Sequence, residues 1–222
     1  MSSMKKPVII MIMFILFRGG AFAGYLSGNS SPYVEGKGAY AFKINTSILM
    51  AGTPFSMICL SGKYGVTDNI GVSMKCGMGT VDYSTISGAR LTTDPVSYAL
   101  GFEYVLTGSK EAEYSAFVAE AENASWSLNR ESNTSSEILY GMDYSYPTSK
   151  VLRTRYRLAV HNFYAGEESE GNIASSLKYS LSTELEYSFS ANFRGCFEAG
   201  MYFGDPIGGI ITLFGLGLGY NF

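Results

Sequence analysis

Apolar and polar residues alternate at the end of the chain, and this alternation constrains the fold more than any other feature. From Ile210 to Phe222, one set of alternate positions is aromatic or aliphatic apart from Thr212, whereas the other set holds Gly215, Gly217, Gly219 and Asn221. Successive side chains of a β-strand point to opposite faces, so the segment is predicted to be a strand with one apolar and one small face. The apolar set comprises Ile210, Phe214, Leu216, Leu218, Tyr220 and Phe222.

The same period of two recurs upstream, with an apolar face opposite a charged or hydroxylated face, whereas helical periodicity is nearly absent. With the terminal segment, about ten strands (eight to twelve) are expected. The other predicted strands are Lys37 to Ile48, Phe55 to Gly65, Ile70 to Gly79, Val96 to Leu106, Glu113 to Ser127, Ser136 to Tyr146, Val151 to Tyr164, Ile173 to Phe189 and Asn192 to Gly204.

One predicted strand, Glu113 to Ser127, breaks the alternation. Glu120 and Glu122 share the parity of Tyr114 and Trp126, which mixes charged and aromatic residues on one face. A β-bulge near Val118 would restore the separation of the two faces.

The faces are best explained if the polar side points inward and the aromatic side outward. Charged residues make up 16% of the chain, below the roughly 25% of soluble domains. A polar interior and an apolar exterior suit a barrel in lipid, where closure satisfies every backbone polar group. Short turns at 66–69, 106–112, 147–150 and 190–192 alternate with other loops. Residues 36–222 are therefore predicted to form an all-β, transmembrane, antiparallel up-and-down β-barrel.

The N-terminal residues 1–23 are predicted to be a cleaved signal peptide. Lys5 and Lys6 precede an apolar run from Pro7 to Phe17, and Ala21-Phe22-Ala23 provides a small-x-small cleavage site. The run is too short for a membrane helix, which needs about 20 residues. Residues 24–35 are then expected to be a periplasmic lead before the barrel.

The C-terminal alternation and one hairpin resemble bacterial outer-membrane β-barrel proteins of the porin-like superfamily. Phe214, Leu216, Leu218, Tyr220 and Phe222 are similar to the C-terminal signal that the barrel-assembly machinery recognises in that class, and the segment Gly62 to Val72 is similar to a common strand-turn-strand unit. The resemblance implies a location in the Gram-negative outer membrane. It also implies contact with outer-membrane lipids, and with periplasmic chaperones and the assembly machinery in transit.

Charged residues on the inward faces form the main candidate site. Arg153, Arg155 and Arg157 on one strand face Glu184 and Glu186 on the next, which neighbour Arg194 and Glu198. Opposite charges on adjacent strands predict charge-assisted hydrogen bonds. The network either plugs a narrow barrel or forms a charged constriction that selects ions. The expected inward set also includes Lys37, Lys43, Lys63, Lys75, Glu103 and Asp143.

His161, the only histidine, is a weak candidate for a catalytic base. Outer-membrane proteases pair an Asp with the His, and outer-membrane lipases place a Ser two residues after it. Here Asn162 and Phe163 follow, so a role in lumen packing is favoured. No Ser-His-Asp set, phosphate loop or metal-ligand spacing is evident, so neither a cofactor nor a metal is expected.

The three cysteines leave two arrangements open. Cys59 and Cys76 would face each other, and permit a disulfide, if the turn between their strands had an even length. An odd turn such as 67–69 keeps Lys63 and Lys75 both inward and leaves Cys76 in lipid. Free thiols, including Cys196, are favoured.

Together these features favour a narrow passive pore or a structural surface protein, not an enzyme. The alternatives are an outer-membrane hydrolase that uses His161 on a lipid or peptide, and a soluble lipid-binding barrel, which would need apolar residues inside. Nucleic acid is not an expected partner, because the net charge is −3.

Overall fold

A computed structural model describes residues 36–51, 53–84, 90–93, 96–109, 114–127, 134–166, 173–203 and 210–222. The predicted signal peptide, 1–23, and the predicted lead, 24–35, lie outside the described residues.

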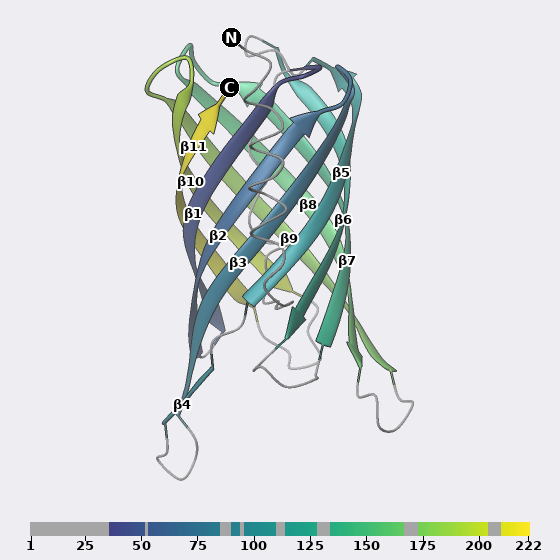
Figure 1. Cartoon of the computed structure of the whole chain (residues 1–222), viewed down its shortest axis with the longest axis vertical. Coiled ribbons are helices and arrows are strands. Elements are labelled where there is room, and N and C mark those ends of the chain that lie inside the picture. The colour runs from purple at the N-terminus through teal and green to yellow at the C-terminus, as the bar shows by residue number, and fades with distance from the viewer. Residues whose placement is uncertain are drawn as a thin grey trace, which may run out of the picture.

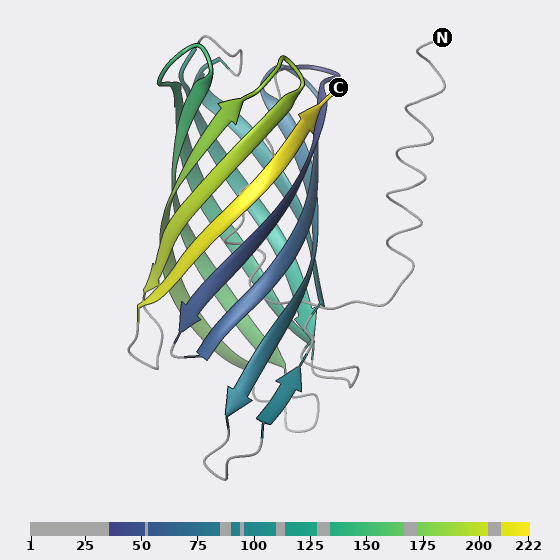
Figure 2. The same ribbon diagram turned by 90° about the vertical axis from the view of Figure 1, so that its left-hand side faces the viewer.

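Ten long antiparallel strands close into a barrel, as predicted (Figures 1 and 2). Consecutive barrel strands pair with each other, and β1 pairs with β11 to close the ring. No helix in the described part of the chain is long and apolar enough to cross a bilayer. The barrel strands are β1 (Tyr40–Ala51), β2 (Thr53–Gly65), β3 (Ile70–Ser84), β5 (Val96–Gly108), β6 (Ala116–Ser127), β7 (Thr134–Pro147), β8 (Leu152–Gly166), β9 (Ile173–Ser188), β10 (Phe193–Phe203) and β11 (Ile211–Asn221).

An eleventh, short strand lies where the sequence predicted a loop. β3 continues past the predicted end at Gly79 to Ser84, and β4 (Arg90–Thr93) pairs with this extension from Val81 opposite Thr93 to Ser84 opposite Arg90. Among the described strands, β4 pairs with β3 alone and prolongs it beyond the barrel rim (Figure 1). The extension is rich in β-branched and aromatic residues, which are enriched in strands.

Three tight turns share one local device. A hydroxyl oxygen of Thr67, Ser149 or Ser190 accepts hydrogen bonds from the backbone N–H groups two and three residues later, at 3.0 to 3.4 Å. Such hydroxyl contacts favour turns over continued strands. The C-terminus lies at the same end of the barrel as these turns, as Figure 1 shows.

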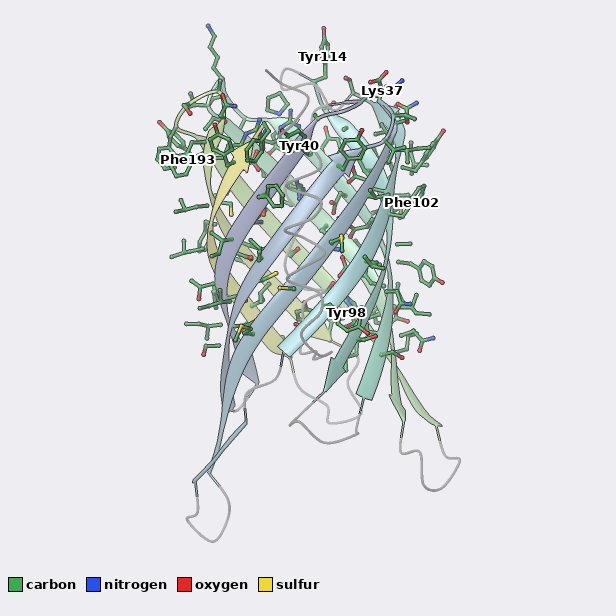
Figure 3. All side chains as sticks on the ribbon, in the orientation of Figure 1. Lys37, Tyr40, Tyr98, Phe102, Tyr114 and Phe193 are labelled. Atoms are coloured by element: carbon green, nitrogen blue, oxygen red, sulfur yellow. The ribbon has the colours of Figure 1, made fainter. Side chains whose placement is uncertain are left out.

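The strand faces divide as the alternation predicted. Large apolar side chains on the outer wall are exposed, among them Leu216 at 62% and Phe102 at 47%, and Figure 3 shows Phe102 pointing away from the barrel. Charged and hydroxyl side chains point inward and are buried. This pattern is the opposite of what a soluble lipid-binding barrel needs, and it suits a barrel surrounded by lipid.

The irregular strand is explained differently from the prediction. Glu122 is buried on the lumen side of β6, and its neighbour Glu120 joins the lumen network, so these two carboxylates do point inward. The register shift lies in β5, between Val105 and Thr107, opposite Val118. The predicted bulge in β6 is therefore wrong. After Phe117, the outward face of β6 carries Ala119, Ala121, Asn123 and Ser125, so it lacks the large apolar residues that mark the lipid side of the other strands.

Candidate functional site in the barrel lumen

Among the described residues, basic and acidic side chains occur in equal numbers in the lumen. All are at most 9% exposed except Glu120, whose side chain is 15% exposed. The basic residues are Lys43, Lys63, Lys75, Arg153, Arg155, Arg157, Lys178 and Arg194, and the acidic residues are Glu103, Glu120, Glu122, Glu137, Asp143, Glu184, Glu186 and Glu198.

The predicted set of Arg and Glu residues on β8, β9 and β10, here called the ladder, is only part of this network. Arg155 lies opposite Glu184, with its Nη1 3.5 Å from Oε1, and Arg194 lies 2.6 Å from Glu186. Arg153 is opposite Glu186 in register, but its guanidinium also donates to the Ser145 hydroxyl at 3.1 Å and to the Tyr114 carbonyl at 3.2 Å.

Arg157 turns away from the ladder. It pairs with Glu120 of β6 and lies 3.9 Å from Asp143 of β7. Glu198 lies directly opposite Glu184, so two carboxylates share the region that Lys43 and Arg155 enter. The ladder therefore extends into a network around much of the wall.

Several ion pairs skip a strand, and a glycine lies beneath each bridge. Glu103 lies opposite Gly71 and pairs with Lys63, which is one strand beyond that glycine. Two further pairs follow the same pattern: Glu122 with Lys75 at 2.6 Å across Gly101, and Glu120 with Arg157 across Gly141.

The contact at these glycines is close. A Cβ on Gly71 would lie 2.5 Å from Glu103 Oε1, and one on Gly141 would lie 2.5 Å from Glu120 Oε1. Only a residue without a side chain leaves the carboxylate room to cross the strand. At Gly71 and Gly141 the missing side chain thus leaves room for the carboxylate, whereas at Gly101 a Cβ would meet the Ser73 hydroxyl oxygen first.

The glycine face of β11 likewise leaves room for side chains of neighbouring strands to cross it. Lys43 of β1 pairs with Glu184 of β9, although β11 and β10 lie between them. A Cβ on Gly217 would lie 2.7 Å from both Asn45 Cβ and Cys196 Sγ. Side chains of β1 and β10 therefore meet over β11.

An apolar layer occupies the lumen toward the end away from the three tight turns. It contains Met57 and Cys59 near the start of β2, Ala99 of β5, Ala124 of β6, Tyr202 near the end of β10 and Leu213 of β11. Leu213 and Cys59 are 0% exposed. The charged network and this layer together leave little solvent contact in the described lumen.

His161 has two polar partners that the sequence did not predict. Its Nδ1 contacts the Glu137 carboxylate, and its Nε2 lies 2.6 Å from the Ser180 hydroxyl oxygen. An ionised carboxylate can only accept, so Nδ1 carries the proton, and a neutral ring would accept the hydroxyl proton at Nε2. Their exposures are 0% for His161, 1% for Glu137 and 6% for Ser180. The Tyr202 ring centroid lies 5.3 Å from that of His161.

Strand register explains why sequence reasoning missed this trio. His161 lies directly opposite Leu139 of β7 and Lys178 of β9. Glu137 lies two residues before Leu139, and Ser180 lies two residues after Lys178, so both reach His161 diagonally. The sequence search for a Ser-His-Asp set did not find this arrangement, in which the acid is a glutamate on another strand. Among the described residues, no cluster of His, Cys, Asp and Glu is arranged to hold a metal ion.

The remaining predicted residues lie outside the network or at its edge. Lys37 precedes β1, is exposed at the barrel rim (Figure 3), and uses its backbone N–H to bond Asp68, so its expected inward position is wrong. Cys59 points inward, Cys76 points outward opposite Leu60, and both are free thiols, as is Cys196. The odd-length turn is confirmed.

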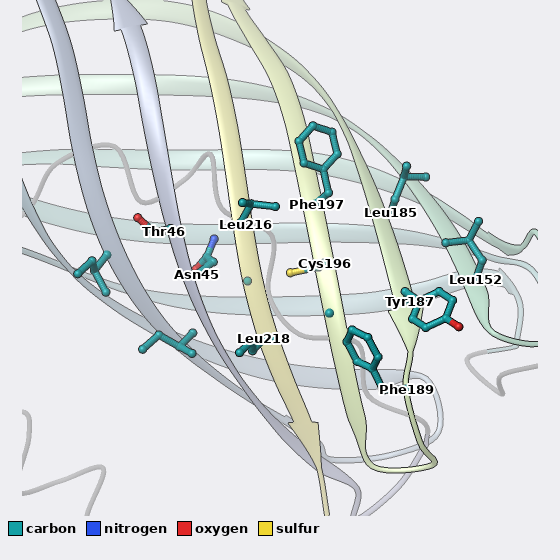
Figure 4. Close-up of a pocket in the computed structure, with 14 residues that line it drawn as sticks. Asn45, Thr46, Leu152, Leu185, Tyr187, Phe189, Cys196, Phe197, Leu216 and Leu218 are labelled. Atoms are coloured by element: carbon teal, nitrogen blue, oxygen red, sulfur yellow. The ribbon is translucent and has the colours of Figure 1, made fainter.

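The C-terminal aromatic residues lie on the outer wall at the seam between β1 and β11. Phe222 stacks on Tyr40 at 4.8 Å between centroids, contacts Tyr220 and Phe42 edge-on, and donates its backbone N–H to the Tyr40 carbonyl at 2.9 Å. Beside this seam, an apolar groove runs over β9, β10, β11 and β1. Figure 4 shows Phe189, Phe197, Leu216 and Leu218 along it.

No family model matches the sequence, and no curated protein matches it. The translocator domain of autotransporter NalP from Neisseria meningitidis is similar in structure, with a TM-score of 0.50 and 12% identity over 84% of this chain and 89% of that one. Weaker matches are the NanC porin, at TM-score 0.45 and 8% identity over 81% and 98%, and the outer-membrane protease OmpT from Escherichia coli, at 0.40 and 9% over 83% and 94%. The chain has the fold of bacterial outer-membrane β-barrels.

Proposed function

We propose that the protein is an integral outer-membrane barrel with a closed lumen, acting as a structural, surface-exposed protein and not as an open pore. The observation that carries this proposal is the balanced set of buried, paired charges, together with the apolar layer across the lumen. A water-filled channel would instead leave its inward side chains hydrated.

Barrel size and ion-pair energetics support a closed lumen. Barrels of about eight strands are filled by side chains, and aqueous channels appear at about sixteen. A permeating ion would have to separate pairs such as Lys75–Glu122 and Arg194–Glu186. Removing one partner of a buried pair costs roughly 3–5 kcal/mol, which indicates the size of the barrier.

The outer surface supports the proposed location. The exposed apolar wall requires lipid, and the aromatic residues around Phe222 end the chain at the rim that carries the three tight turns. We assign this rim to the periplasm and the opposite rim to the cell exterior. Outer-membrane lipids are then the permanent partners. Periplasmic chaperones and the barrel-assembly machinery, which reads Phe214, Leu216, Leu218, Tyr220 and Phe222, act during transit.

Planar-bilayer recording tests the closed lumen. The refolded protein should give no steady conductance, whereas Glu184→Ala and Arg155→Ala should produce flickering openings because each removes a partner from the network. Leu216→Ala, on the outer wall, is the matched control and should stay silent. Resistance of vesicle-bound protein to carbonate extraction verifies insertion. Steady ion-selective conductance of the wild type would overturn the proposal in favour of a passive pore.

A further inference from the structure

We propose that Ser180, His161 and Glu137 form an acyl-transfer site that cleaves esters of small acyl groups. This activity goes beyond the structural role proposed above. It rests on the hydrogen bonds that connect the three side chains in the order hydroxyl, imidazole, carboxylate.

The order of the contacts assigns the roles. Glu137 fixes the His161 tautomer with the proton on Nδ1, which leaves Nε2 free to accept the proton of Ser180 Oγ 2.6 Å away. The same arrangement activates a serine hydroxyl in hydrolases of unrelated fold. Ser180 and His161 would be catalytic residues, and Glu137 a positioning residue that acts through His161.

The trio is held rigidly by the wall of the barrel. Each residue comes from a different strand of the β7, β8 and β9 sheet, and His161 is fully buried between the other two. Sites on strands hold their geometry better than sites on loops.

A small pocket beside Ser180 is lined by two groups that can donate hydrogen bonds, one of which, Arg157, is already paired with Glu120. Arg157 and Tyr202 line it together with Ser180, and a guanidinium or a phenol can donate to an oxyanion. Leu181, Met201 and Leu213 contribute its apolar lining.

The reaction balances with an ester and water as reactants. Ser180 Oγ attacks the ester carbonyl carbon as its proton passes to His161 Nε2, which gives a tetrahedral oxyanion. Collapse of this oxyanion breaks the bond to the alcohol oxygen, which leaves with the proton from Nε2. Water then attacks the acyl-serine, its proton passes through Nε2 back to Ser180, and the carboxylic acid is released.

The size of the pocket limits the substrate to small acyl groups. The pocket leaves no room for a water-sized molecule in this arrangement, so Leu213 and Tyr202 must shift even for an acetyl group. A long acyl chain would disrupt the apolar layer to which both residues belong. A water-soluble ester of acetyl size is therefore the class that the site would take, entering from the rim opposite the tight turns.

Covalent labelling tests the proposal directly. Refolded protein in detergent is treated with a fluorophosphonate probe, and the modified peptide is located by mass spectrometry. Wild type should be labelled on Ser180 and should hydrolyse p-nitrophenyl acetate faster than the octanoate ester. Ser180→Ala should lose both signals. Ser97→Ala, which removes a lumen serine of similar burial on β5, should keep them.

Two further variants separate chemistry from structure. Glu137→Gln should lower the labelling rate by about 10²-fold or more, and Glu137→Asp should recover part of that loss, whereas a purely structural role would not require a carboxylate. Leu213→Ala should raise the rate by enlarging the pocket. Folding of each variant is verified by the shift between heated and unheated samples on a gel.

The outcomes are distinct from those of the conductance experiment. Unlabelled wild type and unlabelled Leu213→Ala, both folded, would overturn the proposal, as would labelling that survives Ser180→Ala. Neither result bears on whether the lumen conducts ions.

Discussion

Replacing Glu184 with glutamine should be among the most destabilising changes to the barrel that keep side-chain size constant. The Glu184 carboxylate pairs with Lys43 from β1 and with Arg155 from β8, and the residue is 3% exposed. The substitution removes the charge that compensates both cations, but it leaves an amide oxygen that can still accept one hydrogen bond.

The magnitude follows from the geometry. At the 3.5 Å separation of Arg155 from Glu184, the Coulomb attraction is about 5 kcal/mol at an effective dielectric constant of about 20. The remaining amide hydrogen bond and the nearby Glu198 recover part of the loss. We therefore expect the free energy of unfolding to fall by roughly 3–5 kcal/mol, the range for removing one partner of a buried pair.

Equilibrium unfolding from lipid vesicles measures this change, with the single tryptophan as the fluorescent reporter. Lys150→Gln, in an exposed turn, is the control and should stay within about 0.5 kcal/mol of wild type. Combining Glu184→Gln with Lys43→Met should cost at least about 1 kcal/mol less than the sum of the two single changes. A loss below about 1 kcal/mol for Glu184→Gln would refute the account of a dry, paired lumen.

Three further predictions concern the glycine positions, the exposure of the cysteine thiols and the assembly of the barrel. Gly141→Ala should lower the free energy of unfolding by about 1–3 kcal/mol, because its methyl group would lie 2.5 Å from a Glu120 carboxylate oxygen. The control Gly219→Ala, whose nearest neighbour lies at 3.4 Å, should change this free energy by about 0.5 kcal/mol or less. Equal losses for the two variants would argue that the glycines do not make room for the bridging ion pairs. A membrane-permeant maleimide should modify Cys76 on the lipid face of folded protein and leave the fully buried Cys59 unmodified, and faster reaction at Cys59 would show an open lumen. Phe222→Ala should reduce the yield of folded barrel in the outer membrane several-fold while the purified protein still refolds in detergent, and an unchanged yield would contradict its role in assembly.

The strands could be predicted from the sequence because lipid and lumen impose opposite polarity at a period of two. The segment from Phe214 to Phe222 shows this most clearly, and its predicted faces are confirmed. The prediction was incomplete where the outward and inward faces of a strand differ little in polarity. β6 presents Ala119 and Ala121 outward, and β4 lies beyond the rim, where neither environment constrains it.

The site was only partly predictable, because the alternation in a strand shows which face a side chain is on but not which side chain it pairs with. Arg155 and Glu184 were expected to pair, since they lie on adjacent strands. The pairing of Arg157 with Glu120 across Gly141 depends on the register of three strands and on the space above a glycine. The contacts of His161 likewise depend on diagonals that only the closed sheet defines.

The most direct test of an apolar outer wall around a closed lumen is a spin-label accessibility scan of reconstituted protein. Single labels replace Ile44 and Ile48, which face outward, and their neighbours Asn45 and Ser47, which face inward, in a background without the native cysteines. The outward labels should collide with dissolved oxygen and not with a water-soluble nickel complex, and the inward labels should be shielded from both. Nickel access at the inward positions would mean a water-filled pore, and nickel access at the outward positions would mean that the wall does not face lipid.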